Sequence, residues 1–120
     1  MKQLKLCVSD YKFMCIVWDN EPIQSGILVK KCLEVLGWKK STTYTMLKKN
    51  SEKGYLKNED SIVTSLISKT AVQAFESEYV IHNTFEGSLP AFITSFIRGK
   101  KLTKEEAEEI RKLIDSNLEG

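Results

Sequence analysis

The spacing of apolar residues in the first half of the chain predicts three helices followed by a β-hairpin. From Ser9, a residue type that suits the start of a helix, apolar side chains recur every three or four residues, and a second series with this spacing ends at Gly37. A third segment ends at Gly54, and residues 55–68 then predict two short strands joined by a tight turn near Asp60–Ser61. The expected inner faces hold Tyr11, Phe13, Met14, Val17 and Trp18 in the first helix and Ile27, Leu28, Cys32, Val35 and Leu36 in the second. This order of elements is the winged helix-turn-helix arrangement, so we expect a mostly α-helical fold with a small β-hairpin.

The third segment, GWKKSTTYTMLKKN (residues 37–50), differs in character from the two helices before it. Its expected inner face consists of Thr43, Met46, Leu47 and Asn50, of which only the middle two are apolar. The opposite face carries hydroxyl groups, which can approach base edges, and lysines, which can reach phosphates. We therefore expect this helix to enter the DNA major groove. The predicted base-reading residues are Ser41, Thr42, Tyr44 and Thr45.

Positive charge is concentrated in the middle of the chain. The whole chain has a net charge of +2, but residues 30–57 hold eight lysines against Glu34 and Glu52, a net charge of +6. Such a cluster is either a solvated face or the binding site of a polyanion, and a protein-binding version of this fold would carry apolar anchors instead. The charge distribution favours DNA. The predicted phosphate contacts are Lys39, Lys40, Lys48 and Lys49, followed by Lys30 and Lys31.

The remaining residues predict three short amphipathic helices that are too small to bury a core of their own. The last of these is expected to begin with a capping box formed by Thr103 and Glu106. We expect the helices to pack on a second copy, which gives a homodimer with residues 1–69 as the winged-helix DNA-binding domain and 70–120 as a helical dimerisation region. The predicted dimer anchors are Phe75, Tyr79, Phe92, Phe96, Ile110 and Leu113.

Several classes of protein are not expected. No apolar run approaches the ~18 residues of a membrane span, and no signal segment is present, so membrane insertion is not expected and the cytoplasm is the predicted location. Three cysteines and the single His82 have neither metal-ligand nor disulfide spacing, and no catalytic constellation surrounds His82, so we expect no enzyme activity, metal or cofactor. Cys15 and Cys32 are expected to be small buried hydrophobes, while control of DNA binding by cysteine oxidation stays open as an alternative.

Three segments of the chain resemble the penicillinase-repressor family. SDYKFMCIVW (9–18) is similar to the family's S-E-W-E-V-M-x-x-x-W, and residues 38–56 follow W-S-P-K-T-V-x-T-x-L-x-R-L-x-x-K-G-x-L without a gap. TSFIRGKKLTKEEAEEI (94–110) runs in step with the family's tail segment. The resemblance implies a dimeric repressor on an inverted-repeat operator of a β-lactamase or antibiotic-response operon. It also implies release by a membrane-bound, β-lactam-sensing metalloprotease that cuts the dimerisation region at the bond matching Ser95–Phe96.

The chain departs from the family pattern at several positions. Lys39–Lys40 replaces Ser-Pro at the start of the third helix, and a nearby phosphate would offset the lost cap and the unfavourable helix dipole. Asn50 stands where relatives carry a core leucine, which would loosen the inner face. Ser95 replaces the asparagine before the cut bond, so a protease that hydrogen-bonds that amide would lose its partner. The expected wing is short and acidic at Glu59 and Asp60, which disfavours phosphate contact, and the absence of a cysteine-rich tail argues against copper sensing.

Overall fold

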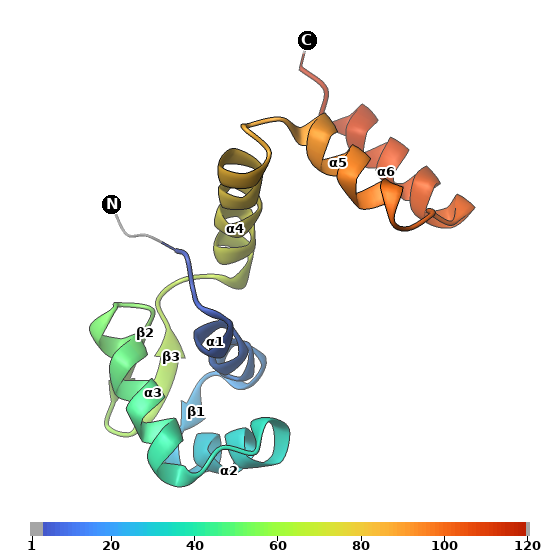
Figure 1. Cartoon of the computed structure of the whole chain (residues 1–120). Coiled ribbons are helices and arrows are strands. Elements are labelled where there is room, and N and C mark those ends of the chain that lie inside the picture. The colour runs from blue at the N-terminus through green and yellow to red at the C-terminus, as the bar shows by residue number, and fades with distance from the viewer. Residues whose placement is uncertain (1–3, 120) are drawn as a thin grey trace. The chain divides into compact units, whose positions relative to one another are not determined.

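The computed structural model describes residues 4–119 and confirms the predicted fold class, mostly helical with a small β-sheet (Figure 1). The elements in chain order are α1 (Val8–Asn20), β1 (Ile23–Gln24), α2 (Ser25–Leu36), α3 (Lys40–Glu52), β2 (Leu56–Glu59), β3 (Ile62–Ser65), α4 (Lys69–Thr84), α5 (Leu89–Arg98) and α6 (Lys104–Ser116). The chain forms two compact units that divide between Tyr79 and Val80, within α4. The functional division expected at residue 69 stays a prediction.

The sheet contains the predicted hairpin and a third strand that the sequence pattern missed. The strands are antiparallel in the order β1-β3-β2, with Ile23 opposite Val63 and Leu56 opposite Ser65. Asp60 and Ser61 form the tight turn with φ of 52° and 64°, as two-residue hairpin turns of this hand require. Because β1 has only two residues, it is too short to show a period of two in the sequence.

The core of the first unit lies between α1, α2, α3 and the sheet. Phe13, Met14 and Val17 of α1 are fully buried, as predicted, and Leu28 and Cys32 of α2 are buried beside them. Among residues 4–119, the buried apolar side chains are Leu6, Phe13, Met14, Ile16, Val17, Ile23, Leu28, Cys32, Met46, Leu47, Tyr55, Leu56, Val63 and Val72. The last of these belongs to α4, so the beginning of that helix completes the core of the first unit.

Two details of the predicted helices were wrong. Ser9 does not cap α1, because the helix begins at Val8 and its N-cap is Cys7, two residues before the expected cap; the Cys7 side chain makes no capping hydrogen bond. Ile27 and Val35 were placed on the inner face of α2 but are 49% and 66% exposed. Ile27 is turned about 100° from Leu28 around the helix, and Val35 lies in the last turn.

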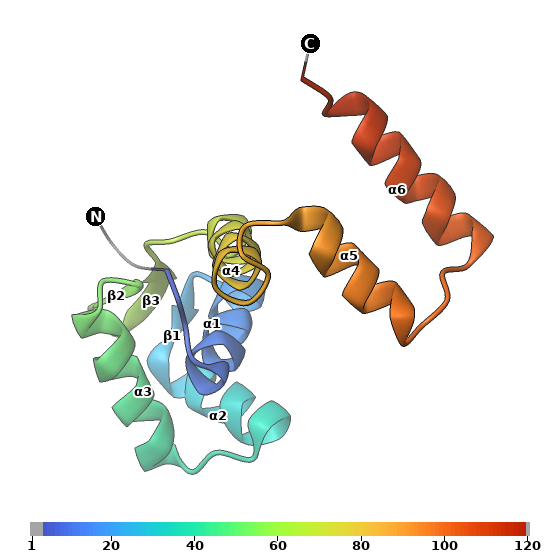
Figure 2. The same ribbon diagram turned by 45° about the horizontal axis from the view of Figure 1, so that its top comes forward.

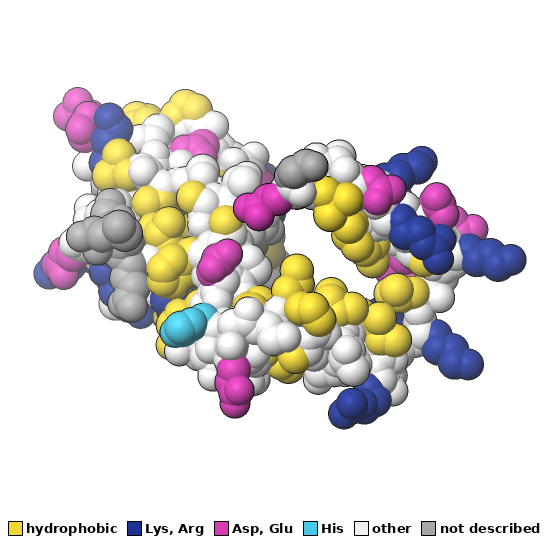
Figure 3. Space-filling view, turned by 90° about the horizontal axis from the view of Figure 1, so that it is seen from above, with side chains coloured by type: hydrophobic (Ala, Val, Ile, Leu, Met, Phe, Trp, Pro, Cys, Tyr) yellow, Lys and Arg dark blue, Asp and Glu magenta, His cyan; other side chains and the backbone are white. Residues whose placement is uncertain are grey.

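In the second unit, helices α5 and α6 have capped N-termini and no buried residue. Ser88 accepts a hydrogen bond from the Ala91 amide (3.1 Å) at the start of α5. The predicted capping box of α6 is confirmed, with the Thr103 hydroxyl accepting from the Glu106 amide (3.0 Å) and the Glu106 carboxylate accepting from the Thr103 amide (3.1 Å). No residue of α5 or α6 is buried, and Figure 3 shows hydrophobic side chains gathered on the surface of this part of the chain.

No helix among residues 4–119 is both long enough and apolar enough to cross a membrane.

Candidate nucleic-acid interface

Helix α3 lies along an outer edge of the first unit, with the hairpin beside its C-terminal half (Figure 2). The start of α3 is anchored by Trp38, just before the helix, whose ring stacks on that of Phe13 of α1 with 6.1 Å between ring centres. The N-cap is Lys39, whose side chain makes no capping hydrogen bond, so the first amides of α3 lack a side-chain acceptor from the cap residue. Anions are favoured at such a helix start.

The two faces of α3 are divided as the sequence predicted. Thr43, Met46, Leu47 and Asn50 are all buried, which confirms the expected inner face. The structure brings the candidate base-reading and phosphate-binding side chains together on the opposite, exposed face; these are Ser41, Thr42, Tyr44, Thr45 and Lys48, with Lys40 beside them. The outer face therefore presents short hydroxyl groups and cations on a helix whose orientation is fixed by a buried opposite face.

Local contacts order part of this outer face. The Thr45 hydroxyl donates a hydrogen bond to the Ser41 carbonyl (2.9 Å), which fixes its direction and leaves its oxygen free to accept. The Lys40 ammonium lies 6.0 Å from the centre of the Tyr44 ring. These contacts hold a hydroxyl, an aromatic ring and a cation within the first turns of the helix.

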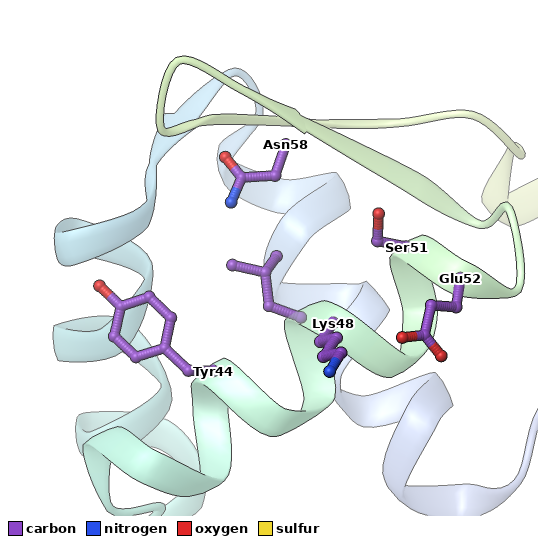
Figure 4. Close-up of a pocket in the computed structure, with 6 residues that line it drawn as sticks. Tyr44, Lys48, Ser51, Glu52 and Asn58 are labelled. Carbon is purple, nitrogen blue, oxygen red and sulfur yellow. The ribbon is translucent and has the colours of Figure 1, made fainter.

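A hollow of about 350 Å³ separates the outer face of α3 from the hairpin (Figure 4). Its lining combines Tyr44, Leu47, Lys48, Ser51 and Glu52 of α3 with Asn58 of β2. The sequence pattern does not indicate Ser51, Glu52 or Asn58 as part of the interface, because only the folded hairpin brings β2 beside the helix. The Glu52 carboxylate disfavours phosphate at this end of α3, so the cationic character of the face is strongest near its N-terminus.

Lys49 of α3 and Lys53, the C-cap residue of that helix, form ion pairs with α1. Lys49, predicted as a phosphate contact, has its ammonium 3.2 Å from one carboxylate oxygen of Asp10, and the Lys53 ammonium lies 3.2 Å from the other. Asp10 itself is fully buried. Burial raises the pKa of Asp10, but hydrogen bonds with Cys7, Lys49 and Lys53 outweigh it and hold the pKa below its usual value. The same contact raises the pKa of Lys49.

The burial of Asp10 could have been predicted from its spacing relative to the apolar residues of α1. Asp10 precedes Phe13, Met14 and Val17 by three, four and seven residues, which places it on the buried stripe of α1. A buried carboxylate needs a partner of opposite charge, and the lysine-rich third helix could supply one.

The remaining predicted cations lie outside α3. Lys30 of α2 is exposed, whereas Lys31 is half-buried. On the hairpin, Lys57 pairs with Glu59 at 3.8 Å, so the one lysine of β2 already has an acidic neighbour.

The cysteines differ in accessibility. Cys32 is fully buried, as predicted, and burial raises the pKa of its thiol, which makes it unreactive. Cys15 is half-buried, less than expected, and Cys7 is exposed.

Comparison with known proteins shows the family of the chain. No curated protein matches it, but residues 6–116 match the family described as penicillinase repressor. This match covers nearly the whole chain, including α3, the hairpin and helices α4 to α6. The chain therefore belongs to the penicillinase repressor family, and it is a DNA-binding transcriptional repressor.

Proposed function

We propose that this repressor works as a homodimer and inserts α3 of each protomer into the major groove of an inverted-repeat operator. The observation that carries the proposal is the division of α3 into a buried inner face and an exposed face of hydroxyls and lysines. A protein-binding surface would present apolar anchors, and the only large apolar group exposed on this face of α3 is the Tyr44 ring.

The proposed contacts fall into two groups. Ser41, Thr42, Tyr44 and Thr45 read base edges, and Lys39, Lys40 and Lys48 bind phosphates, with Lys30 and Lys31 as further phosphate contacts from α2. Lys49 is the least suited of the predicted phosphate contacts because it already pairs with Asp10.

Dimerisation is assigned to the second half of the chain. Its helices leave large apolar side chains in solvent: Phe96 is 50% exposed and Leu113 is 62% exposed. The Phe92 ring meets Phe85 edge-on (5.3 Å between ring centres) and lies tilted against Phe96 (6.5 Å), so Phe85 and α5 together form an aromatic cluster that a second copy can cover. The proposed anchors are Phe75, Tyr79, Phe92, Phe96, Ile110 and Leu113.

Release is proposed to follow cutting of the Ser95–Phe96 bond by a membrane-bound sensor metalloprotease, in the cytoplasm and in response to a β-lactam. Both residues are exposed, which supports access, but the bond lies inside α5. A protease binds its substrate as an extended chain, so α5 must unwind locally before it is cut. Cutting there would divide the aromatic cluster and weaken the dimer, and the operators served are proposed to be those of a β-lactamase or antibiotic-response operon.

The test compares Thr45→Ala with Lys48→Ala on a duplex that the protein has enriched from a random pool and on an unrelated duplex. Thr45→Ala should reduce discrimination by about 1–3 kcal/mol per affected base pair and leave binding to the unrelated duplex nearly unchanged. Lys48→Ala should weaken both duplexes alike. Identical behaviour of the two variants would contradict the division of roles on α3.

A further inference from the structure

One buried carboxylate, that of Asp10, joins α1 to two residues of the proposed recognition helix and to the C-cap residue that follows it. Oδ1 of Asp10 lies 3.2 Å from the Lys49 ammonium and accepts a hydrogen bond from the side-chain amide of Asn50 at 3.3 Å. Oδ2 lies 3.2 Å from the Lys53 ammonium. The side-chain amide of Asn50 also donates to the Met46 backbone carbonyl (2.8 Å), so a contact within α3 fixes the orientation of this side chain. Asp10 is 0% exposed and sits on the helix face that carries Phe13 and Met14.

These contacts constrain the orientation of α3. Positions 49, 50 and 53 share one side of the helix, and a rigid carboxylate that binds all three resists both rotation about the helix axis and sliding along it. One residue of rotation corresponds to about 100°, so even a small turn would move the hydroxyls of the outer face away from the base edges they are proposed to contact.

The same contacts hold two cations away from the DNA-facing surface. Lys49 directly follows the exposed Lys48, and Lys53 lies about one turn further along the chain, yet both ammonium groups lie against Asp10 of α1. Their side chains are 41% and 44% exposed, so without the carboxylate both ammonium groups could swing into solvent.

We infer that Asp10 is a positioning residue for DNA recognition, which sets the rotation of α3 and withholds Lys49 and Lys53 from phosphate. The inference rests on the proposed reading of DNA by α3. Its consequence is selectivity: the carboxylate favours the operator by holding the base-reading face in place, and it lowers affinity for unrelated DNA by keeping two cations occupied.

The test is Asp10→Asn in the full chain, measured below the unfolding temperature of the variant. Asparagine has the same shape but no charge, so it releases the two lysines. Affinity for an unrelated duplex should rise, and the slope of log K against log[salt] on that duplex should steepen by up to about 1.8 for each bound protomer. The ratio of affinities for enriched and unrelated duplexes should fall about 5- to 150-fold, the effect of losing one base-pair contact.

The matched control is Asp19→Asn, which removes the same charge from an exposed position of the same helix. It should leave the affinity ratio unchanged. A parallel loss of binding to both duplexes in Asp10→Asn, or an unchanged salt slope, would overturn the inference, since a purely structural role predicts weaker binding to every sequence.

A second variant covers the case in which Asp10→Asn does not fold. Lys53→Ala removes one of the withheld cations, so the slope on unrelated DNA should stay at the value of the unaltered protein while the affinity ratio falls. A shallower slope or an unchanged ratio would overturn the inference. Failure of the proposed function itself would be distinguishable, because the unaltered protein would then show no sequence preference or no salt dependence.

Discussion

The salt dependence of operator binding can be worked out from the lysines that the structure leaves available. Three lysines at α3, namely Lys39, Lys40 and Lys48, are exposed. If each binds one phosphate, a dimer neutralises six phosphates, and log K against log[salt] should have a slope of about −5. Adding Lys30 and Lys31 from both protomers brings the slope to about −9.

These slopes correspond to a large measured effect. Raising salt from about 50 to 200 mM should weaken binding by about 10³- to 10⁵-fold. Fluorescence anisotropy of a labelled duplex enriched from a random pool, titrated at five or six salt concentrations, would give the slope directly. Lys48→Ala should make the slope shallower by about 2, because each dimer loses two contacts. Lys112→Ala, an exposed lysine of α6, serves as the control and should leave it unchanged.

Two results would refute the reasoning. A flat salt response would mean that the lysines of α3 do not meet phosphate. A slope near −13 would mean that Lys49 and Lys53 also bind phosphate, and it would contradict their assignment to Asp10.

Three further predictions concern the assembly and its stability. A chain ending at Tyr79 should be monomeric by sedimentation and bind a single half-site weakly, because linked half-sites gain by avidity; a chain ending at Lys69 should also be less stable, since it loses the buried Val72. The lowered pKa of Asp10 stabilises the fold at pH values above the usual 3.8 of an aspartate, and this stabilisation is lost as pH falls below it. Acid denaturation followed by circular dichroism should therefore show a smaller loss of stability at low pH in Asp10→Asn, and equal losses would contradict the assignment. Mass measurement after co-expression with the cognate sensor and addition of a β-lactam should give fragments that meet at Ser95–Phe96, whereas an intact chain after full induction would exclude release by cutting.

The parts of the fold that were predicted correctly are those set by local periodicity and turn chemistry. Thr43, Met46, Leu47 and Asn50 were placed on the inner face of α3 by spacing alone, even though two of them are polar. The hairpin turn and the capping box of α6 follow from short-range hydrogen bonding and backbone preferences, which neighbouring residues determine.

The features that were missed depend on contacts between residues distant in the chain. Asp10 pairs with Lys49 and Lys53, which are far from it in the chain, and the spacing of residues within one segment cannot show that pairing. It also changes the interpretation of Asn50, which was expected to loosen the inner face. In the structure this side chain donates to Asp10 and to the Met46 carbonyl, so it belongs to a buried polar cluster that links α1 and α3.

A selection experiment tests most directly whether the protein is a symmetric dimer that reads DNA sequence through α3. Duplexes recovered by the full-length protein from a random pool should converge on an inverted repeat whose half-sites are spaced by about one helical turn, 10–10.5 base pairs, or a multiple of it. Thr45→Ala should recover a less defined half-site with the same spacing. Recovery of a single unpaired half-site, or of no enriched sequence at all, would contradict the account.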